Sequence, residues 1–245
     1  MVRADGLEVA LVLIAGQEYS QCTEIEAGDW LYALTFTADG EYLVSGTMNG
    51  VQVWRVKDGK GVATMPMEHV YCVAVSKDGR FIAAGSKGDV FVWDATNYEQ
   101  VFVGGVDRTT IFDVDFSPDS TRLVSADGGH DVATVWDIGK GQKVRQLDHG
   151  RWVQAAKYSP QGDRIATATV GSVRVWNNDD GQLLVDIRME LTPWHGLLWF
   201  SIDTNYLFVE CDGKIRQIDG FTGSTVSSVA MENSRGRSSC LSELR

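Results

Sequence analysis

The sequence has few basic residues for its length. Its 245 residues include 22 Lys and Arg against 33 Asp and Glu, which gives a formal net charge of −11 and a pI near 4.8. A surface that binds nucleic-acid phosphates needs clustered Lys and Arg side chains, and the sequence contains no such cluster. The composition therefore predicts no nucleic-acid partner.

Cysteines and long apolar runs are also scarce. The sequence has four cysteines, Cys22, Cys72, Cys211 and Cys240. They form no CxxC pair and no disulfide framework, which indicates unpaired thiols in a reducing compartment. The apolar run from Leu7 to Ala15 contains Glu8 and follows an acidic flank; it is too short to span a membrane and makes a poor signal peptide. We therefore expect no membrane partner and a cytoplasmic location, with the nucleus as the alternative.

Signatures of catalysis and of metal binding are missing. The sequence contains no GxSxG, Walker-type or HExxH motif, and none of the serines in its turns has a base in register. The loop from Asp127 to Asp131 carries two carboxylates and His130, but nothing nearby in sequence supplies the further ligands that a metal ion needs. We interpret this loop as an insertion at a loop tip. The sequence thus predicts no catalytic residue, no cofactor and no metal.

What the sequence does contain is a repeat. The stretch from Ile111 to Asp137 reads as three short segments with alternating apolar residues, Ile111 to Phe116, Arg122 to Ser125 and Val132 to Trp136. A Ser-Pro-Asp turn and an Asp-Gly-Gly turn separate them, which is the spacing of an antiparallel meander. A single copy cannot bury both of its faces, whereas a side-by-side array can.

Tryptophans mark the period of this repeat. The residues that close the third segment of successive copies are Trp54, Trp93, Trp136 and Trp176, at intervals of 39, 43 and 40 residues. The next slot, 41 residues further on, is Gln217. The turn before each second segment also recurs, as TADG, SKDG, SPDS and SPQG. The period therefore persists over five copies.

A period of about 40–45 residues with four strands per unit and a Trp-Asp pair is the signature of WD-repeat β-propeller blades. The chain resembles the WD-repeat family over roughly residues 6–230; the pair is complete at Trp93 and Trp136, whereas Trp54 and Trp176 keep only the tryptophan. The resemblance implies an all-β fold. We expect a β-propeller of four-stranded antiparallel blades, with five whole blades and a partial one in an open or incomplete ring.

The repeat divides the chain into three predicted regions. Residues 1–29 form the third and fourth strands of a partial blade, residues 30–230 form five WD-type repeats, and residues 231–245 form a polar tail outside the repeats. The outer strand of the partial blade is predicted at Tyr19 to Ile25. Because its inner strands are missing, we expect a piece of a longer protein, with unsealed terminal blades that favour self-association.

The family's hydrogen-bonded tetrad is only partly present. In WD-repeat proteins a His before the first strand, a Ser or Thr on the second, an Asp before the third and the Trp form a buried chain. By resemblance, the second and last members of the tetrad are Ser45 with Trp54, Ser125 with Trp136 and Thr167 with Trp176. His149 keeps the His position, and the Asp position holds Asn49, Gly88 or Gly171. Since every tetrad is incomplete, we expect apolar packing to hold the blades together.

Aromatic residues recur where each first strand begins. We count back from the aromatic residue or Val that ends each first strand to the positions four and six residues before it. Side chains alternate along a strand, so the side chains at these two positions point to the same side. By resemblance, these positions look onto the narrow top face that commonly binds partners. The predicted partner-binding residues are Trp30, Tyr32, His69, Tyr71, Phe112, Trp152 and Trp194. Tyr and Trp are common binding hot spots, although some of these side chains could instead seal the packing between blades.

The leading functional hypothesis is a non-catalytic scaffold that binds a protein or peptide on this aromatic face. One alternative is a sensor part of a larger nucleotide-binding receptor, and another is a degraded gene product without its own function. A third is a propeller-fold hydrolase or oxidoreductase, for which only Asp113 and Asp115 are available near the central channel. Asp115 and Lys157 occupy the same slot in neighbouring repeats, where they either pair across blades or remain solvated.

Overall fold

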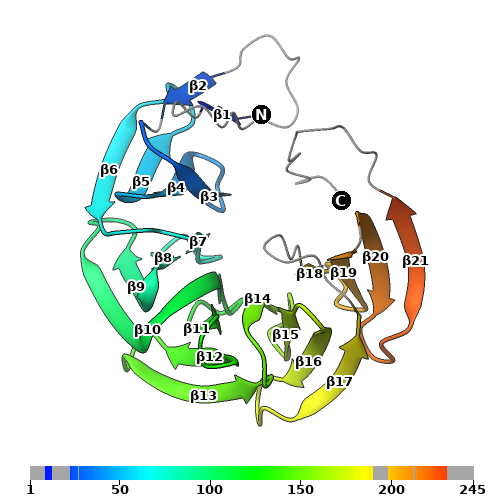
Figure 1. The fold of residues 1–245 in the computed structure, drawn as a ribbon. Coiled ribbons are helices and arrows are strands. Elements are labelled where there is room, and N and C mark those ends of the chain that lie inside the picture. Colours follow the sequence, from blue (N-terminus) through cyan, green and yellow to red (C-terminus); the bar gives the residue numbers. More distant parts are fainter. Residues whose placement is uncertain (1–8, 13–22, 27, 190–197, 212, 231–245) are drawn as a thin grey trace.

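The computed structural model describes residues 9–12, 23–26, 28–189, 198–211 and 213–230. Every regular element in these ranges is a β-strand. Figure 1 shows the strands grouped in sheets that lie radially around a common centre. The described part of the chain is therefore an open β-propeller, which confirms the predicted all-β fold class.

Five groups of four antiparallel strands follow one another along the chain. The first repeat contains β3 (Leu31–Phe36), β4 (Tyr42–Thr47), β5 (Gly50–Arg55) and β6 (Gly61–Pro66). The second contains β7 (Cys72–Val75), β8 (Phe81–Gly85), β9 (Lys87–Asp94) and the start of β10 (Gln100–Phe116). The third contains the rest of β10, β11 (Arg122–Asp127), β12 (Val132–Asp137) and β13 (Gln142–Asp148).

The last two groups have the same order. The fourth repeat contains β14 (Val153–Tyr158), β15 (Arg164–Thr169), β16 (Ser172–Asn177) and β17 (Leu183–Arg188). The fifth contains β18 (Leu198–Phe200), β19 (Tyr206–Cys211), β20 (Lys214–Asp219) and β21 (Thr225–Ala230). In each repeat the first strand lies nearest the centre and the fourth forms the rim (Figure 1).

Strand β10 is longer than predicted and joins two blades. Its residues Gln100 to Gly105 pair with β9, whereas Ile111 to Phe116 pair with β11. The register shifts between Gly105 and Thr110, where the chain passes from the rim of one blade to the centre of the next. Because this connection stays extended instead of forming a turn, the second and third blades share one seven-stranded sheet. The expectation of a separate sheet for every blade is wrong at this point.

Hydroxyl groups close the turn after each inner strand. In the second repeat Ser76 Oγ donates to Asp78 Oδ1 at 2.7 Å and accepts the backbone N–H of Phe81 at 2.9 Å. Equivalent side-chain bonds join Thr37 to Asp39, Ser117 to Asp119, Ser159 to Asp163 and Ser201 to Asp203. Ser, Thr and Asp side chains satisfy turn backbone groups locally, which accounts for the recurring turn sequences.

The apolar cores lie between neighbouring sheets. Val124 and Val135 of the third repeat, for example, belong to one buried cluster with Ala156 and Ile165 of the fourth. Similar clusters join the other neighbouring repeats. Each inner sheet therefore buries apolar side chains on both faces, so its stability depends on the blades beside it.

Three of the four closing tryptophans are bonded as the resemblance implies. Their indole Nε1 donates to a hydroxyl on the second strand: Trp54 to Ser45 at 2.9 Å, Trp136 to Ser125 at 2.8 Å and Trp176 to Thr167 at 2.7 Å. These bonds fix the third strand against the second within one blade.

The fifth repeat corrects one predicted position. The strand ladder places Ile218 opposite Leu207, the position that Trp176 holds opposite Ile165 in the fourth repeat. Ile218 is fully buried, whereas the Gln217 side chain is hydrogen-bonded to β21 at the surface. The tryptophan slot therefore belongs to Ile218 and not to Gln217. A slip of one residue reverses the face of every side chain on a strand, and the apolar residue takes the inward position.

The N-terminal strands form a small sheet of their own. Strand β1 (Val9–Val12) pairs antiparallel with β2 (Thr23–Glu26). Ile25 is buried against Leu43, Val56 and Trp54 of the first repeat, so this sheet covers part of that blade. The predicted outer strand overlaps β2 at residues 23–25, and its first four residues lie outside the described ranges, as does the predicted tail.

Candidate functional site

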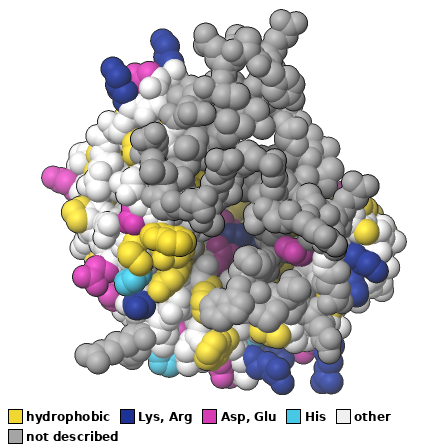
Figure 2. Space-filling model, turned by 45° about the horizontal axis from the view of Figure 1, so that its top comes forward, with side chains coloured by type: hydrophobic (Ala, Val, Ile, Leu, Met, Phe, Trp, Pro, Cys, Tyr) yellow, Lys and Arg dark blue, Asp and Glu magenta, His cyan; other side chains and the backbone are white. Residues whose placement is uncertain are grey.

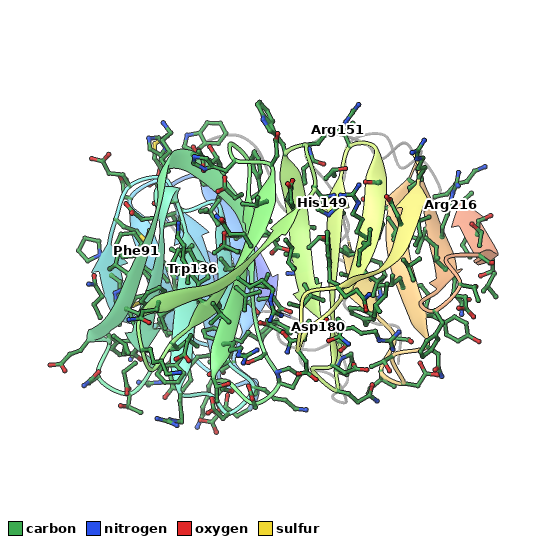
Figure 3. All side chains as sticks on the ribbon, turned by 90° about the horizontal axis from the view of Figure 1, so that it is seen from below. Phe91, Trp136, His149, Arg151, Asp180 and Arg216 are labelled. Atoms are coloured by element: carbon green, nitrogen blue, oxygen red, sulfur yellow. The ribbon has the colours of Figure 1, made fainter. Side chains whose placement is uncertain are left out.

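The inner strands all begin on one face of the propeller, which we call the top face. Figure 3 shows Arg151, which precedes β14, at this face and Asp180 at the opposite one. Backbone hydrogen bonds link the first two repeats here. The Met48 N–H donates to the Trp30 carbonyl at 3.2 Å, and the His69 N–H donates to the Met48 carbonyl at 2.8 Å. Trp30 and His69 are therefore held on either side of Met48.

Four of the predicted partner-binding residues gather at this point. The rings of Tyr32 and Tyr71 lie 5.7 Å apart at 57°, and the His69 ring lies nearly parallel to Tyr71 with 6.3 Å between centroids. Trp30 and Tyr32 are 53% and 43% exposed. We call Trp30, Tyr32, His69 and Tyr71 the aromatic patch. On the face of the molecule that Figure 2 shows, hydrophobic side chains lie beside a histidine.

The backbone of His69 is strained. Its φ of 52° lies in the left-handed region, which residues other than glycine rarely adopt. Hydrogen bonds on both sides hold it there, from the His69 N–H to Met48 and from the Val70 N–H to the Thr47 carbonyl at 3.0 Å. Strain of this kind persists where the surrounding structure enforces it, and it is concentrated at functional sites.

Acidic side chains border the aromatic patch. Asp29 Oδ1 accepts the backbone N–H of Trp30 at 2.7 Å, and its Oδ2 accepts Asn49 Nδ2 at 2.6 Å. Glu68 is exposed and directly precedes His69. A fixed carboxylate and a free one therefore flank the exposed rings.

The other predicted residues lie on later repeats. Phe112 is half-buried, and its ring packs so closely over Gly128 that a side chain at that position would overlap it. Trp152 is 55% exposed at the start of the fourth repeat. Trp194 lies outside the described residues. The structure therefore groups the predicted residues of the first two repeats and places Phe112 and Trp152 on the next two.

A charged cluster joins the inner strands of the third and fourth repeats. Lys157 Nζ lies 2.8 Å from Asp113 Oδ1, so the cross-blade ion pair forms with Asp113 and not with Asp115 as the sequence suggested. Asp115 instead accepts the backbone N–H of Tyr158 at 2.7 Å, and Asp113 Oδ2 accepts that of Ala156 at 3.1 Å. Both carboxylates thus cap N–H groups on the open edge of β14, a role that requires the neighbouring blade.

This cluster shifts the ionisation of its members. Burial raises the pKa of Asp115 to about 6, although Lys157 opposes the shift. Burial by itself would lower the pKa of Lys157, but the carboxylates of Asp113 and Asp115 raise it above its ordinary value. Lys157 therefore carries a positive charge that neutralises the carboxylates between the two blades.

The loop after β11 is more ordered than a simple insertion. Asp127 is 1% exposed, and its Oδ1 accepts the Thr109 hydroxyl at 2.5 Å and the Gly129 N–H at 2.9 Å. Its Oδ2 lies 3.1 Å from His130 Nδ1, and the His130 side chain is 44% exposed. A buried carboxylate thus orients a histidine on the surface. In the sequence, this pair is marked by an Asp at the end of an apolar strand and a His three residues after it.

His149 forms part of a buried polar chain in the fourth repeat (Figure 3). Trp176 Nε1 donates to Thr167 Oγ1, which in turn contacts His149 Nε2. In the tautomer in which the Thr167 hydroxyl donates to Nε2, the neutral imidazole carries its proton on Nδ1, which has no partner among the described atoms. Burial lowers the pKa of His149 to about 4, with a further contribution from Arg174. The role of His149 is therefore structural.

The described residues contain no group of three or more His, Cys, Asp or Glu side chains placed to hold a metal ion. No helix long and apolar enough to cross a membrane occurs among them.

Comparison with known families identifies the repeats. Residues 59–94 and 98–137 match the family model described as WD domain, G-beta repeat. The chain carries WD40 repeats. Each matched WD40 segment begins at the outer strand of one blade and ends at the closing Trp-Asp pair of the next, so the sequence repeat is offset from the structural blade by one strand.

Individual relatives agree with this family. A WD repeat-containing protein of Synechocystis, named as uncharacterized, is 28% identical over 167 residues, which are 67% of this chain and 36% of that protein. The small ribosomal subunit protein RACK1y of rice is 28% identical over 120 residues, 45% of this chain and 35% of the relative. The RACK1 protein of Medicago sativa is 30% identical over 76 residues, 31% and 23% of the two chains. The matched parts thus span little more than a third of these relatives at most.

Proposed function

We propose that this WD-repeat chain is a non-catalytic interaction scaffold that binds a protein or peptide segment on its top face. The aromatic patch is the proposed centre of this surface. Phe112, Trp152 and, from the repeat register alone, Trp194 extend it across the later repeats. The described thiols, Cys72 and Cys211, are buried and form no disulfide among the described residues, in keeping with the expected reducing compartment, the cytoplasm or the nucleus.

The contrast between tryptophans supports this proposal most strongly. Trp30 and Trp152 are more than half exposed, whereas Trp93 and Trp136 are 5% and 2% exposed. Burial of a large aromatic ring is worth several kcal/mol, and exposed rings that cluster, as Tyr32 does with Tyr71, are typical of binding surfaces. Tyr and Trp rings are rigid and amphipathic, and they dominate measured hot spots. The net charge of −11 favours a protein partner over RNA or DNA.

Two other functions remain as alternatives. A sensor segment of a larger nucleotide-binding receptor would use the same top face for a ligand. A propeller-fold enzyme would need a reactive centre, and the oriented imidazole of His130 beside Asp127 would be its starting point. Replacement of His130 by Gln should leave partner binding by the aromatic patch intact, which separates the two sites.

The experiment compares variants for binding to a partner isolated with the wild-type chain. Trp30→Ala and Tyr71→Ala should weaken binding by about 2 kcal/mol or more each, while thermal unfolding changes little. Ile202→Ala is the matched control, because Ile202 is 91% exposed in the turn after β18, which lies on the opposite face. Equal losses in the control and in the patch variants would refute the proposal.

A further inference from the structure

We propose that the aromatic patch selects partner segments that carry a cationic side chain, Arg or Lys, and seats that cation on the exposed rings. This inference rests on the proposed function of the top face and specifies its ligand. It draws on the arrangement of the rings, on the carboxylates beside them and on the charge of the whole chain.

The rings present faces that a cation can contact. Trp30 and Tyr32 are about half exposed, and Tyr32 and Tyr71 are inclined at 57° with 5.7 Å between their centroids. These two rings are tilted against each other and not stacked flat. The His69 ring lies nearly parallel to that of Tyr71. A cation within about 6 Å of such ring faces is attracted by their negative quadrupole, most strongly for Trp and Tyr.

The charges beside the rings have the matching sign. Asp29 is held next to Trp30 by two hydrogen bonds, so its carboxylate cannot turn away without losing both. Glu68 is exposed one residue before His69. Lys87, two residues beyond the Gly85 carbonyl that accepts the Tyr71 N–H, carries an opposing charge.

The charge of the chain reinforces this local imbalance. With a net charge of −11, the protein attracts basic segments at long range and repels acidic ones. A purely apolar segment could cover the rings, but it would leave the Asp29 and Glu68 carboxylates without a counter-charge at the edge of the contact. A cationic side chain satisfies both requirements because Arg and Lys combine an apolar stem with a charged end.

The test uses four capped heptapeptides, Gly-Ser-Gly-Xaa-Gly-Ser-Gly, in which Xaa is Arg, Lys, norleucine or Glu. Binding is followed at low salt by the NMR shift of the Trp30 indole N–H, assigned by comparison with Trp30→Phe. The Arg and Lys peptides should bind about tenfold more tightly than norleucine, and the Glu peptide more weakly still. Asp29→Asn and Glu68→Gln should each reduce the preference for Arg over norleucine by about threefold. Ile202→Ala should leave all four affinities unchanged.

Three results would overturn the inference: equal binding of the norleucine and Arg peptides, tighter binding of the Glu peptide, or no binding of the Arg peptide at concentrations of about 10 mM. The proposed function is judged separately, by whether Trp30→Ala weakens binding of the isolated partner. If Trp30→Ala lost binding to the isolated partner but the wild-type chain bound the Arg and norleucine peptides equally, the proposed scaffold function would stand. Only the proposed cationic ligand would then be refuted. If Trp30→Ala left partner binding unchanged, the scaffold proposal itself would fail.

Discussion

At the scale of single residues, the tryptophans form two groups. Trp136 and Trp176 are buried and donate to hydroxyls within their own blades. Trp30 and Trp152 stand at the start of inner strands and remain in solvent. The same residue type therefore stabilises a blade in one position and offers a contact surface in the other.

Alanine substitution should separate these groups. Trp136→Ala removes a buried ring and leaves a cavity, so the free energy of unfolding should fall by about 3–5 kcal/mol. Trp152→Ala should change it by about 0.5 kcal/mol or less, because an exposed ring loses little burial. Denaturant unfolding of both variants measures the difference. If Trp152→Ala destabilises as severely as Trp136→Ala, the ring belongs to the core and its assignment to the binding surface is wrong.

His149 should make stability depend on pH. Its folded-state pKa of about 4 lies below its ordinary value, so the folded state resists protonation. The stabilising contribution is complete above about pH 6.5 and is lost as the pH falls towards 4. Wild type should lose about 2–3 kcal/mol through this residue across that window, and His149→Gln should lose much less. Urea unfolding at a series of pH values tests this.

Asp115→Asn is the control with the opposite sign. The pKa of Asp115 is raised to about 6, so the folded state binds more protons than the unfolded state between about pH 4 and 6. Stability from this residue therefore falls as the pH rises through that window. The Asn variant should gain stability relative to wild type at neutral pH. A His149→Gln variant that keeps the full wild-type slope would contradict the assignment of that slope to His149.

At the scale of the strand and turn, the fourth repeat comes closest to a complete buried chain. His149, Thr167 and Trp176 are connected, and only the acceptor for His149 Nδ1 is missing. By resemblance this acceptor is an Asp in the turn before the third strand, where the chain has Gly171. A Cβ at Gly171 would meet only Arg151 Nη1, at 3.7 Å, which is an ordinary contact. The turn thus has room for the absent side chain.

Gly171→Asp should therefore stabilise the protein. A carboxylate that accepts the Nδ1 proton satisfies a buried donor, and the free energy of unfolding should rise by about 1–2 kcal/mol. Gly171→Ala is the control for the change in backbone entropy alone, which is worth about 0.4–1 kcal/mol. The pKa of His149 should also rise in the Asp variant, measurable by NMR titration. If the Asp variant were no more stable than the Ala variant, the added acceptor would not reach His149.

At the scale of the whole molecule, neighbouring blades are linked by polar as well as apolar contacts. Arg164 of the fourth repeat is 4% exposed and donates to the Thr204 carbonyl at 2.7 Å and the Gly220 carbonyl at 3.3 Å in the fifth. Its guanidinium lies 4.3 Å from the Phe221 ring. With the Lys157 and Asp113 pair, these contacts fix how successive blades are placed around the centre.

Among the described residues, the rim of the fifth blade is exposed at positions that are covered in the fourth blade. In the fourth repeat Val173 pairs with Ile187, and both contribute to the core shared with the next blade. The equivalent pair in the fifth repeat is Ile215 with Val229, yet Val229 is 66% exposed. Every described residue of β21 is exposed. In the fifth repeat, an apolar position that is packed in the core of the fourth repeat is therefore exposed to solvent.

The chain of residues 1–245 should self-associate through this face. Val229→Lys should reduce association because a charge cannot be buried in such a contact. Val103→Lys is the control: Val103 is 41% exposed on the rim strand β10, in a blade that the third repeat covers. Sedimentation velocity across a wide range of concentration measures both. A wild-type chain that stays monomeric throughout would refute this prediction.

Much of the fold could be predicted because its signals are local. In three repeats the closing Trp bonds to a Ser or Thr on the adjacent strand, and the turns bond within a few residues, so both features recur in the sequence at a fixed period. Gln217 shows the limit of that approach. Where the period drifts and no tryptophan marks the slot, only the strand ladder decides whether residue 217 or 218 faces the core.

The sequence by itself determined the class of fold, the number of described repeats and the Trp partners, because these depend on alternation and spacing along one strand or hairpin. Tertiary structure decided that Lys157 pairs with Asp113 and that Asp127 orients His130. It also decided that Tyr32 and Tyr71 meet while Phe112 packs on Gly128. The Lys157 and Tyr32 contacts depend on how far one blade is rotated and shifted against the next, and that offset is set by side-chain packing between sheets, which a periodic pattern does not encode. The Asp127 and Phe112 contacts lie within the third repeat and depend on how the loop after β11 folds against the inner strand of its own blade.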